Sequence, residues 1–255
     1  MDDTALAGKT ILVTRPAEQA AGLSRLIQDA GGTPFVFPAI EIKEPSDPER
    51  LAGVLARLEE FDLAIFVSPT AVARAFEYFD ARTDWPENLD AAAVGQGTAW
   101  ALKVSGINHV IAPVGQSDSE ALLALPALQD VAGKRILIFR GEGGRELMAQ
   151  TLTQRGALVE YAECYRRTKP DKNIAPLLEQ HGHQAFSAVV LTSREGLANF
   201  HEMLGNAWGA FKSVPAFVPH ERIAEAARKL GMHSVHVTSA GDAGTMQAMI
   251  KFFQS

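Results

Sequence analysis

The residues best suited to chemistry in this chain are arginines and serines that follow short apolar runs. Arg15 and Arg140 occupy equivalent positions after two such runs, and Ser68 and Ser193 follow two others, ahead of helical patterns. If the runs are strands of a parallel sheet, these side chains lie where helix N-termini offer N–H groups and positive partial charge to an anion. Serine is also a common helix N-cap and arginine often forms surface ion pairs, so both alternatives remain open.

Tyr165 is the candidate proton donor. It stands in a long extended segment and is followed by Arg166 and Arg167. A phenol keeps its proton at neutral pH and can donate it to a reacting group. An aromatic residue in a strand also packs well against its neighbours, and this alternative remains open too.

Most other familiar sites are excluded by spacing. The glycine-containing loops 95–98 and 141–145 lack G-x-G-x-x-G, and G-x-x-x-x-G-K-[ST] does not occur, so tight strand-to-helix turns explain these glycines. The H-x-H and H-x-x-H pairs have no evident third ligand, which argues against a metal site. The sequence contains no G-x-S-x-G motif. Any chemistry would therefore depend on positioning more than on a nucleophile.

Composition narrows the class of protein further. The 255 residues carry a formal net charge of −6, which argues against nucleic acid as a partner. Cys164 is the single cysteine, so a disulfide framework is excluded and a reducing compartment fits; we expect it to be a packed thiol. No apolar run reaches the roughly 18 residues that span a bilayer, and the start MDDTALAGKT does not resemble a secretory signal. We expect a cytoplasmic protein.

An internal repeat organises the chain. The segment GKTILVTR at 8–15 resembles GKRILIFR at 133–140, and the same offset of 125 residues relates further segments without a gap. This self-similarity predicts two homologous halves, about 8–125 and 133–250.

Each half alternates apolar, β-branched runs with helical patterns, which is typical of parallel sheets covered by helices. The predicted strands span about 10–14, 33–37, 62–67, 91–94, 109–112, 135–139, 157–162, 187–192, 215–218 and 234–238. Predicted helices include Ala17–Ala30 and Glu146–Arg155. The extended segments Pro34–Ile42 and Val159–Thr168 are too long for a strand of one compact unit. We expect each to run from one lobe to the next, with a cleft between the lobes.

A set of short motifs adds a resemblance to this pattern. They are VTRP at 13–16, FPAIE at 37–41, FVSP at 66–69 with Ala71-Val72, VGQGTA at 94–99, SDSE at 117–120, RGEGGREL at 140–147, CYRR at 164–167, LTS at 191–193 and ERIA at 221–224. In this order and spacing the chain resembles the bacterial type of the uroporphyrinogen-III synthase family over essentially its full length.

The resemblance implies an α/β fold of two Rossmann-like or flavodoxin-like lobes with parallel sheets, joined by a two-stranded β-ladder. One lobe would comprise residues 1–36 and 170–255 and the other 42–161, with linker strands at 37–41 and 162–169. The first βαβ segment would return to the lobe formed by the C-terminal third. The repeat alone would instead suggest two sequential domains divided near residue 130.

The resemblance also implies a reaction. Hydroxymethylbilane, a linear tetrapyrrole with eight carboxylates, would be cyclised to uroporphyrinogen III with inversion of ring D and loss of water, without a metal or organic cofactor. Tyr165 matches the family's candidate acid for loss of the terminal hydroxyl. Because the free substrate closes without inversion, the enzyme would act chiefly by holding it in place. The expected state is a monomer, with transient contact to hydroxymethylbilane synthase as a possible partnership.

The carboxylates of such a substrate would be bound at helix N-termini and by arginines. The candidates are Arg15, Ser68, Gly95, Thr98, Ser117, Arg140, Ser193, His220 and Thr238. His220 departs from the small residue expected at its position.

Two other classes of protein remain as rivals. A two-lobed protein that binds an anion without catalysis would show the same symmetry, but would give Tyr165 no special purpose. A nucleotide-sugar transferase would need a phosphate loop and an acidic partner for the ribose, and neither is identifiable.

Overall fold

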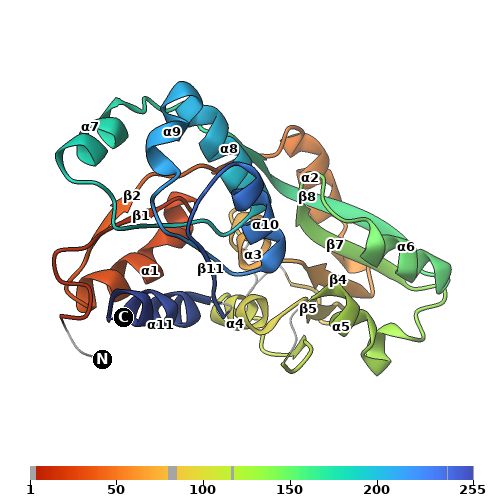
Figure 1. Cartoon of the computed structure of the whole chain (residues 1–255). Helices are drawn as coiled ribbons and strands as arrows, with labels where there is room; N and C mark the ends of the chain where they lie inside the picture. Colours follow the sequence, from red (N-terminus) through yellow and green to blue (C-terminus); the bar gives the residue numbers. More distant parts are fainter. Residues whose placement is uncertain (1–3, 80–84, 116–117, 240, 255) are drawn as a thin grey trace. The chain divides into compact units, whose positions relative to one another are not determined.

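The chain forms two compact units. The computed structural model describes residues 4–79, 85–115, 118–239 and 241–254. Unit 1 comprises residues 1–42 and 168–255, and unit 2 comprises residues 43–167. In Figure 1, unit 1 is drawn in red to orange and teal to blue, and unit 2 in orange to green. The chain therefore leaves unit 1 once and returns to it once.

Unit 1 is built on a five-stranded parallel sheet with the strand order β2-β1-β9-β10-β11. These strands are β1 (Thr10–Val13), β2 (Thr33–Val36), β9 (Ala188–Val190), β10 (Ala216–Val218) and β11 (Val235–Val237). The helices are α1 (Ala17–Asp29), α7 (Ala175–His183), α8 (Arg194–Leu204), α9 (Trp208–Phe211), α10 (Glu221–Lys229) and α11 (Gly241–Gln254), with a 3-10 turn η3 (Gly205–Ala207).

Both faces of this sheet are buried, because successive side chains of a strand point to opposite faces. Ile11 and Val13 join the core cluster that contains residues of α1 and α11, whereas Leu12 joins the cluster formed with α7 to α10. Figure 1 shows α1 and α11 side by side, and the two helices are in contact. The continuous apolar runs predicted from the sequence therefore reflect a sheet covered on both sides.

Unit 2 contains a second sheet with the order β3-β8-β7-β4-β5-β6, in which β8, β7, β4, β5 and β6 are mutually parallel. The strands are β3 (Glu41–Lys43), β4 (Leu63–Phe66), β5 (Asp90–Ala93), β6 (Val110–Ile111), β7 (Arg135–Gly141) and β8 (Leu158–Thr168). The helices are α2 (Pro48–Leu55), α3 (Pro69–Ala75), α4 (Gln96–Val104), α5 (Ser119–Leu123) and α6 (Leu147–Gln154), with 3-10 turns η1 (Leu58–Glu60) and η2 (Pro126–Leu128).

The second sheet is also packed on both faces. Ile65 and Ile138 lie in a core cluster with residues of α5 and α6. The alternate residue Phe66 stacks on Phe139 with a centroid distance of 4.2 Å and meets Phe76, which directly follows α3. Strands β7 and β4 thus form the buried centre of unit 2 and carry the ends on which the candidate site is built.

Strands 125 residues apart hold the same place in the two sheets. By this offset β1 corresponds to β7, β2 to β8, β4 to β9, β5 to β10 and β6 to β11, so the order β2-β1-β9-β10-β11 repeats as β8-β7-β4-β5-β6. Each sheet nevertheless combines strands from both halves of the sequence: two with three in unit 1, and four, counting β3, with two in unit 2. The first βαβ segment pairs with the C-terminal strands through β1 and β9, which excludes two sequential domains divided near residue 130.

The two long extended segments differ from each other. Residues 158–168 form the single strand β8. The segment Pro34–Ile42 is interrupted instead: β2 ends at Val36 and β3 begins at Glu41. Pro38 in the gap has no N–H group to donate to a ladder, which explains why one strand does not continue through it. The strand predicted over 33–37 is therefore present as β2, and the expected extended segment Pro34–Ile42 is divided between β2 and β3.

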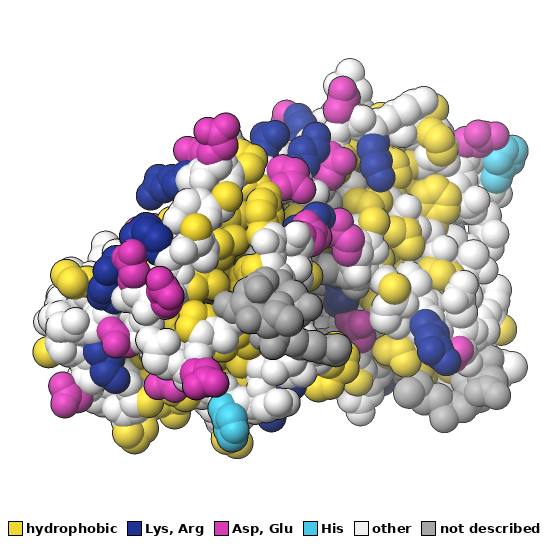
Figure 2. Space-filling view, turned by 180° about the vertical axis from the view of Figure 1, so that it is seen from behind, with side chains coloured by type: hydrophobic (Ala, Val, Ile, Leu, Met, Phe, Trp, Pro, Cys, Tyr) yellow, Lys and Arg dark blue, Asp and Glu magenta, His cyan; other side chains and the backbone are white. Residues whose placement is uncertain are grey.

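The surface shows no single dominant charge on the face drawn in Figure 2, where Lys and Arg side chains lie among Asp and Glu side chains. Among the described residues, no helix has both the length and the apolar character that a membrane span requires.

Candidate active site

Tyr165 is a buried residue of β8 that lies against the end of the neighbouring strand β7. Its exposed fraction is 4%. The register between the two strands shifts here, since Arg140 pairs with Glu163 whereas Gly141 pairs with Tyr165. This β-bulge places Tyr165 opposite the glycine that ends β7.

Gly141 is required by the position of the Tyr165 ring. A Cβ atom on Gly141 would lie 2.6 Å from Cε2 and 2.7 Å from Cζ of the tyrosine. Carbon atoms in contact are normally about 3.5–4.0 Å apart. Only a residue without a side chain therefore allows the ring to cross the end of β7 toward β4, the next strand of the sheet.

The Tyr165 hydroxyl reaches Ser68, which directly follows β4. The two oxygens are 3.4 Å apart, and either can be the donor. Ser68 is also the N-cap of α3, because its Oγ accepts the Ala71 N–H at 3.1 Å. When the Ser68 hydroxyl donates to the tyrosine, the phenol proton stays available for a ligand. The sequence thus identified two residues that the structure brings together, and the N-cap role holds as well.

A cavity of about 270 Å³ adjoins Tyr165. Its lining includes the guanidinium-bearing side chains of Arg140, Arg145 and Arg167, together with Tyr161 and Tyr165. Pockets for drug-sized ligands measure about 300–1,000 Å³, so this cavity has room for part of a large ligand. Three arginines beside a buried phenol favour an anionic ligand at a proton donor.

Arg140 is held within the protein. Its side chain is 6% exposed, and Nη1 lies 3.0 Å from a carboxylate oxygen of Glu146. Nε donates to the Gly141 carbonyl at 3.2 Å, and Nη2 donates to the Gly143 carbonyl. The guanidinium also lies over the Tyr161 ring, 4.4 Å from its centroid. Arg140 is therefore buried itself but pairs with a carboxylate that is 51% exposed, so the ion pair reaches the surface through Glu146.

Tyr161 completes this group and was not identified from the sequence. Its hydroxyl donates to Glu146 at 2.5 Å. Burial, and then the bond to Glu146, raise the pKa of Tyr161 to about 12. The hydrogen bonds from Tyr161 and Arg140 lower the pKa of the Glu146 carboxyl. Tyr161 precedes Tyr165 by four residues in one strand, and period-two spacing was the available signal.

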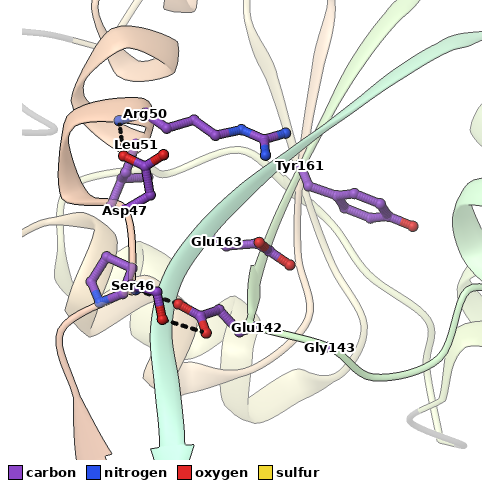
Figure 3. A pocket seen from close by; sticks show the side chains of 9 residues that line it. Ser46, Asp47, Arg50, Leu51, Glu142, Gly143, Tyr161 and Glu163 are labelled. Carbon is purple, nitrogen blue, oxygen red and sulfur yellow. Dashed lines mark hydrogen bonds between the residues drawn. The ribbon is translucent and has the colours of Figure 1, made fainter.

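A second cavity of about 270 Å³ lies beside the first and shares Gly143 and Tyr161 with it. Figure 3 shows Glu142 directed at Ser46, and the Asp47 carboxylate directed at the backbone of Arg50. Glu142 accepts the Ser46 hydroxyl at 3.0 Å and also the Ser46 N–H. Its charge therefore fixes the loop after β7 to the segment before α2.

Gly95 and Thr98 stand at the start of α4, next to Ser68. Gly95 is the N-cap of α4 in extended conformation, and Thr98 is 4% exposed. A Cβ on Gly97 would meet Pro69 at 3.9 Å, so the first turns of α3 and α4 are neighbours.

Another predicted binding residue, Ser117, lies outside the described residues. The residue after it, Asp118, caps α5 by accepting the Ala121 N–H at 2.8 Å.

In unit 1, Arg15 follows β1 and pairs with Asp242 of α11. Gly22 of α1 leaves space for this carboxylate, because a Cβ there would lie 2.9 Å from Asp242 Oδ2. The Arg15 Nε atom is buried and has no hydrogen-bond partner. Arg15 thus retains an unused donor beside its ion pair.

The other predicted residues of unit 1 follow the neighbouring strands β9, β10 and β11. Ser193 caps α8, since its Oγ accepts the Gly196 N–H at 2.9 Å. His220 occupies the N-cap position of α10 but makes no capping hydrogen bond with its side chain. Thr238 is buried, and its hydroxyl donates to the Ser239 carbonyl at 2.9 Å. The carboxyl edge of this sheet therefore carries the counterparts of the Ser68 and Gly95 positions.

The described residues offer neither a metal site nor a reactive thiol. Among the described residues, no group of three or more His, Cys, Asp and Glu side chains is placed to hold a metal ion. Burial raises the pKa of Cys164 to about 12, and its Sγ donates to the Ala162 carbonyl at 3.2 Å. Cys164 is a packed thiol and not a nucleophile at neutral pH.

Comparison with known proteins relates this chain to one family. Residues 21–250 match the family described as "Uroporphyrinogen-III synthase HemD". The uroporphyrinogen-III synthase of Escherichia coli K12 is 36% identical over 236 residues, which cover 91% of this chain and 96% of that protein. The uroporphyrinogen-III synthase of Synechococcus elongatus is 31% identical over 216 residues, covering 82% of this chain and 80% of the relative.

Solved structures share the fold. The crystal structure of a mutant uroporphyrinogen III synthase from Thermus thermophilus has a TM-score of 0.61 at 20% identity and covers 97% of this chain and 99% of its own. The uroporphyrinogen-III synthetase of Helicobacter pylori 26695 has a TM-score of 0.60 at 16% identity, with 96% and 99% covered. The α/β fold of two units predicted from the sequence is confirmed by these neighbours.

Proposed function

The chain belongs to the uroporphyrinogen-III synthase family of tetrapyrrole-forming lyases, and from this premise we propose that Tyr165 is the acid that starts ring closure. The substrate would be hydroxymethylbilane and the product uroporphyrinogen III, with ring D inverted and one water lost. The observation that carries the proposal is the buried phenol of Tyr165 beside a cavity lined by three arginines.

The proton balance follows from the position of the phenol. Tyr165 donates its proton to the terminal hydroxymethyl oxygen, the carbon–oxygen bond breaks, and water leaves from a cationic pyrrole methylene. Attack on this carbon by the substituted position of ring D gives a spiro intermediate. The bond from that position to the methylene of ring C then breaks, and the freed methylene bonds to the unsubstituted α position of ring D, which closes the inverted ring. The proton that the new macrocycle releases returns to the tyrosinate. The Ser68 and Tyr165 oxygens are 3.4 Å apart, and in the arrangement in which Ser68 donates, its hydroxyl stabilises the tyrosinate that the step forms.

Selectivity between the two ring closures is a matter of holding the substrate. The direct closure of the free substrate needs no inversion, so the enzyme has to make the inverting closure faster by orientation. We propose that helix N-termini and hydroxyls at the carboxyl edges of the sheets bind the carboxylates. The candidate residues are Ser68, Gly95, Thr98 and Ser117 from unit 2 and Arg15, Ser193, His220 and Thr238 from unit 1. For Arg15, the unused Nε–H supports this role.

The first experiment is analysis of the isomers formed. Hydroxymethylbilane is generated in situ, the purified chain is added without cofactor, and the oxidised products are separated into uroporphyrins I and III. Predominant isomer III is expected from the parent chain. Tyr165→Phe should lower kcat by about 10²-fold, at the lower end of what a general acid contributes, without abolishing turnover. Tyr78→Phe, which removes a hydroxyl bound to Glu44 outside the cavity, is the matched control and should keep full activity.

Other outcomes would redirect the assignment. Isomer I formed at the uncatalysed rate, together with tight binding of the tetrapyrrole, would mean a two-lobed anion-binding protein without catalysis. Isomer III formed equally fast by Tyr165→Phe would mean that another group supplies the proton.

The setting of the reaction is also part of the proposal. The free and buried thiol of Cys164 fits a reducing, cytoplasmic compartment. We expect the chain to act as a monomer and to receive its unstable substrate through transient contact with hydroxymethylbilane synthase. Sedimentation of the chain alone, and then with that enzyme, tests both expectations.

A further inference from the structure

We propose that Arg140 is a positioning residue that sets the place of Tyr165 through the loop after β7, and that it is not a ligand for substrate carboxylates. This loop, residues 141–146, is called the glycine loop below. The inference rests on the proposed role of Tyr165 as the acid. It differs from the sequence-based hypothesis, in which the charge of Arg140 binds the substrate.

The contacts of Arg140 are directed into the glycine loop. Each of its three guanidinium nitrogens already donates to an acceptor there: Nε to Gly141, Nη1 to Glu146 and Nη2 to Gly143. Three of its five N–H groups are thus committed to the glycine loop before a substrate carboxylate arrives. With 6% of its side chain exposed, Arg140 also has little surface left to present to a ligand.

The backbone of the glycine loop is folded around the guanidinium. Gly143 and Gly144 have φ values of +69° and +104°, which side-chain-bearing residues rarely adopt. A Cβ on Gly144 would lie 3.4 Å from Arg140 Nη2. The two glycines therefore let the loop fold back toward Arg140. Carbonyl groups of the loop can then accept hydrogen bonds from the guanidinium.

The glycine loop in turn touches Tyr165 at two points. The Gly141 backbone lies against the ring, so that a single added carbon atom would overlap Cε2. The Glu142 N–H donates to the Tyr165 carbonyl at 2.8 Å. A displacement of the loop would thus move the backbone that supports the ring and the strand that bears it.

Two side-chain contacts hold the ends of the glycine loop. Glu146 accepts from Tyr161, whose ring also lies beneath the Arg140 guanidinium. Glu142 is bound to Ser46 at the other end. Arg140 is the member of this network that bonds to three different residues of the loop, so we expect its loss to have the largest effect.

The two roles of Arg140 predict different effects of Arg140→Lys. Lysine keeps the positive charge and would partly replace arginine as a carboxylate ligand. A single ammonium cannot reproduce the planar fork that reaches three acceptors, so it should not replace arginine as a positioning residue. The conservative variant therefore separates the hypotheses.

The test measures kcat and KM for formation of isomer III by Arg140→Lys, Arg140→Gln and Tyr161→Phe. We expect both Arg140 variants to lose about 10- to 100-fold in kcat, as misplacement of a reacting group by roughly 1 Å does, with KM within about threefold of the parent. Tyr161→Phe keeps the ring under the guanidinium and removes one of the two hydrogen bonds to Glu146, so a smaller loss of about threefold is expected. Thermal unfolding of each variant shows whether it is folded at the assay temperature.

A double-mutant cycle tests whether Arg140 acts through Tyr165. In the Tyr165→Phe background, Arg140→Gln should cost about threefold or less, because the group that it positions is gone. If Arg140→Gln does not fold, Tyr161→Phe takes its place in the cycle.

Several results would overturn the inference. One is full kcat in Arg140→Lys, and another is a raised KM with kcat retained in Arg140→Gln; both would make Arg140 a ligand. A third is a kcat loss in the Arg140→Gln, Tyr165→Phe double variant equal to the product of the two single losses. That result would mean that Arg140 does not act through Tyr165. Failure of the proposed function looks different: Tyr165→Phe would then be as active as the parent, whatever the Arg140 variants do.

Discussion

The close approach of Tyr165 to Gly141 predicts that one added methyl group impairs the enzyme. In Gly141→Ala, the new Cβ would lie 2.6 Å from Cε2 of the ring and 3.1 Å from its hydroxyl oxygen. Because ordinary carbon contacts are about 3.5–4.0 Å, the ring has to retreat by roughly 1 Å. The ring is 4% exposed, so its retreat also displaces packed neighbours.

Two magnitudes follow for Gly141→Ala. Overpacking of a filled interior costs about 1–3 kcal/mol, which for a chain of this size lowers Tm by roughly 2–10 °C. The contact of 3.4 Å between the Tyr165 and Ser68 oxygens is already long, and a further 1 Å removes it. A misplacement of that size at a reacting group lowers kcat by about 10²-fold.

The assay is formation of isomer III from saturating hydroxymethylbilane, with thermal unfolding measured on the same preparations. The matched control is Gly53→Ala in α2, where an added Cβ meets nothing within 4 Å. Since alanine is favoured over glycine in a helix by about 0.5–1 kcal/mol, this control should keep its activity and gain stability.

The reasoning is refuted by a Gly141→Ala variant with the kcat and Tm of the parent. A variant that loses stability but keeps full kcat would show that the placement of the ring does not limit the reaction. In the Tyr165→Phe background, Gly141→Ala should lower Tm again but cost little further activity, because the phenol is absent.

Three further predictions concern other parts of the chain. Arg15→Gln should raise KM by about tenfold at unchanged kcat, since a hydrogen bond to a charged group contributes about 1.5 kcal/mol, and an unchanged KM would leave Arg15 as a structural partner of Asp242 alone. Ser193→Ala should lower the free energy of unfolding by about 1 kcal/mol through loss of the α8 N-cap, seen as a lower urea midpoint; an unaltered midpoint would contradict this. The pKa of Cys164 is raised to about 12, so the folded chain keeps a proton that the unfolded chain releases above about pH 9. Stability should therefore fall as pH rises from 9 toward 12, by about 1.4 kcal/mol at pH 10, and urea unfolding at pH 8 and 10 should show a smaller decrease in Cys164→Ala.

The sequence predicted the edge at which Ser68 lies, because parallel strands bring the residues that follow them to one carboxyl edge of a sheet. It placed Tyr165 in a linker between lobes, whereas the structure places this residue in β8, paired with the end of β7. The apolar runs predicted the strands to within a few residues, except that β8 continues to Thr168 and that β3 follows no apolar run. What the sequence did not contain was the order β8-β7-β4, which makes Gly141 the residue that the tyrosine ring has to cross.

Other members of the site depend on contacts that spacing does not reveal. Glu142 and Ser46 are 96 residues apart and meet only because two loops converge. The register of Tyr165 depends on the bulge that places it, and not Cys164, opposite Gly141. The glycines of 141–145 were interpreted as turn residues, which is correct for Gly143 and Gly144 but incomplete for Gly141. Side-chain packing against a backbone has no signature in a single sequence.

The exchange of strands between the halves of the sequence also bears on how the chain is made. Unit 2 is one uninterrupted stretch, whereas β1 has to wait for β9, with Ile11 pairing with Ala188. At about 5–20 residues per second, a ribosome needs roughly ten to thirty seconds to deliver that partner. During this time β1 has β2 on one side, but the side that will pair with β9 is open and the segment bears an apolar face. A nascent chain that ends after Arg167 would thus contain all of unit 2, together with a βαβ segment of unit 1 that lacks its partner β9. We expect chaperones to bind at this stage of synthesis.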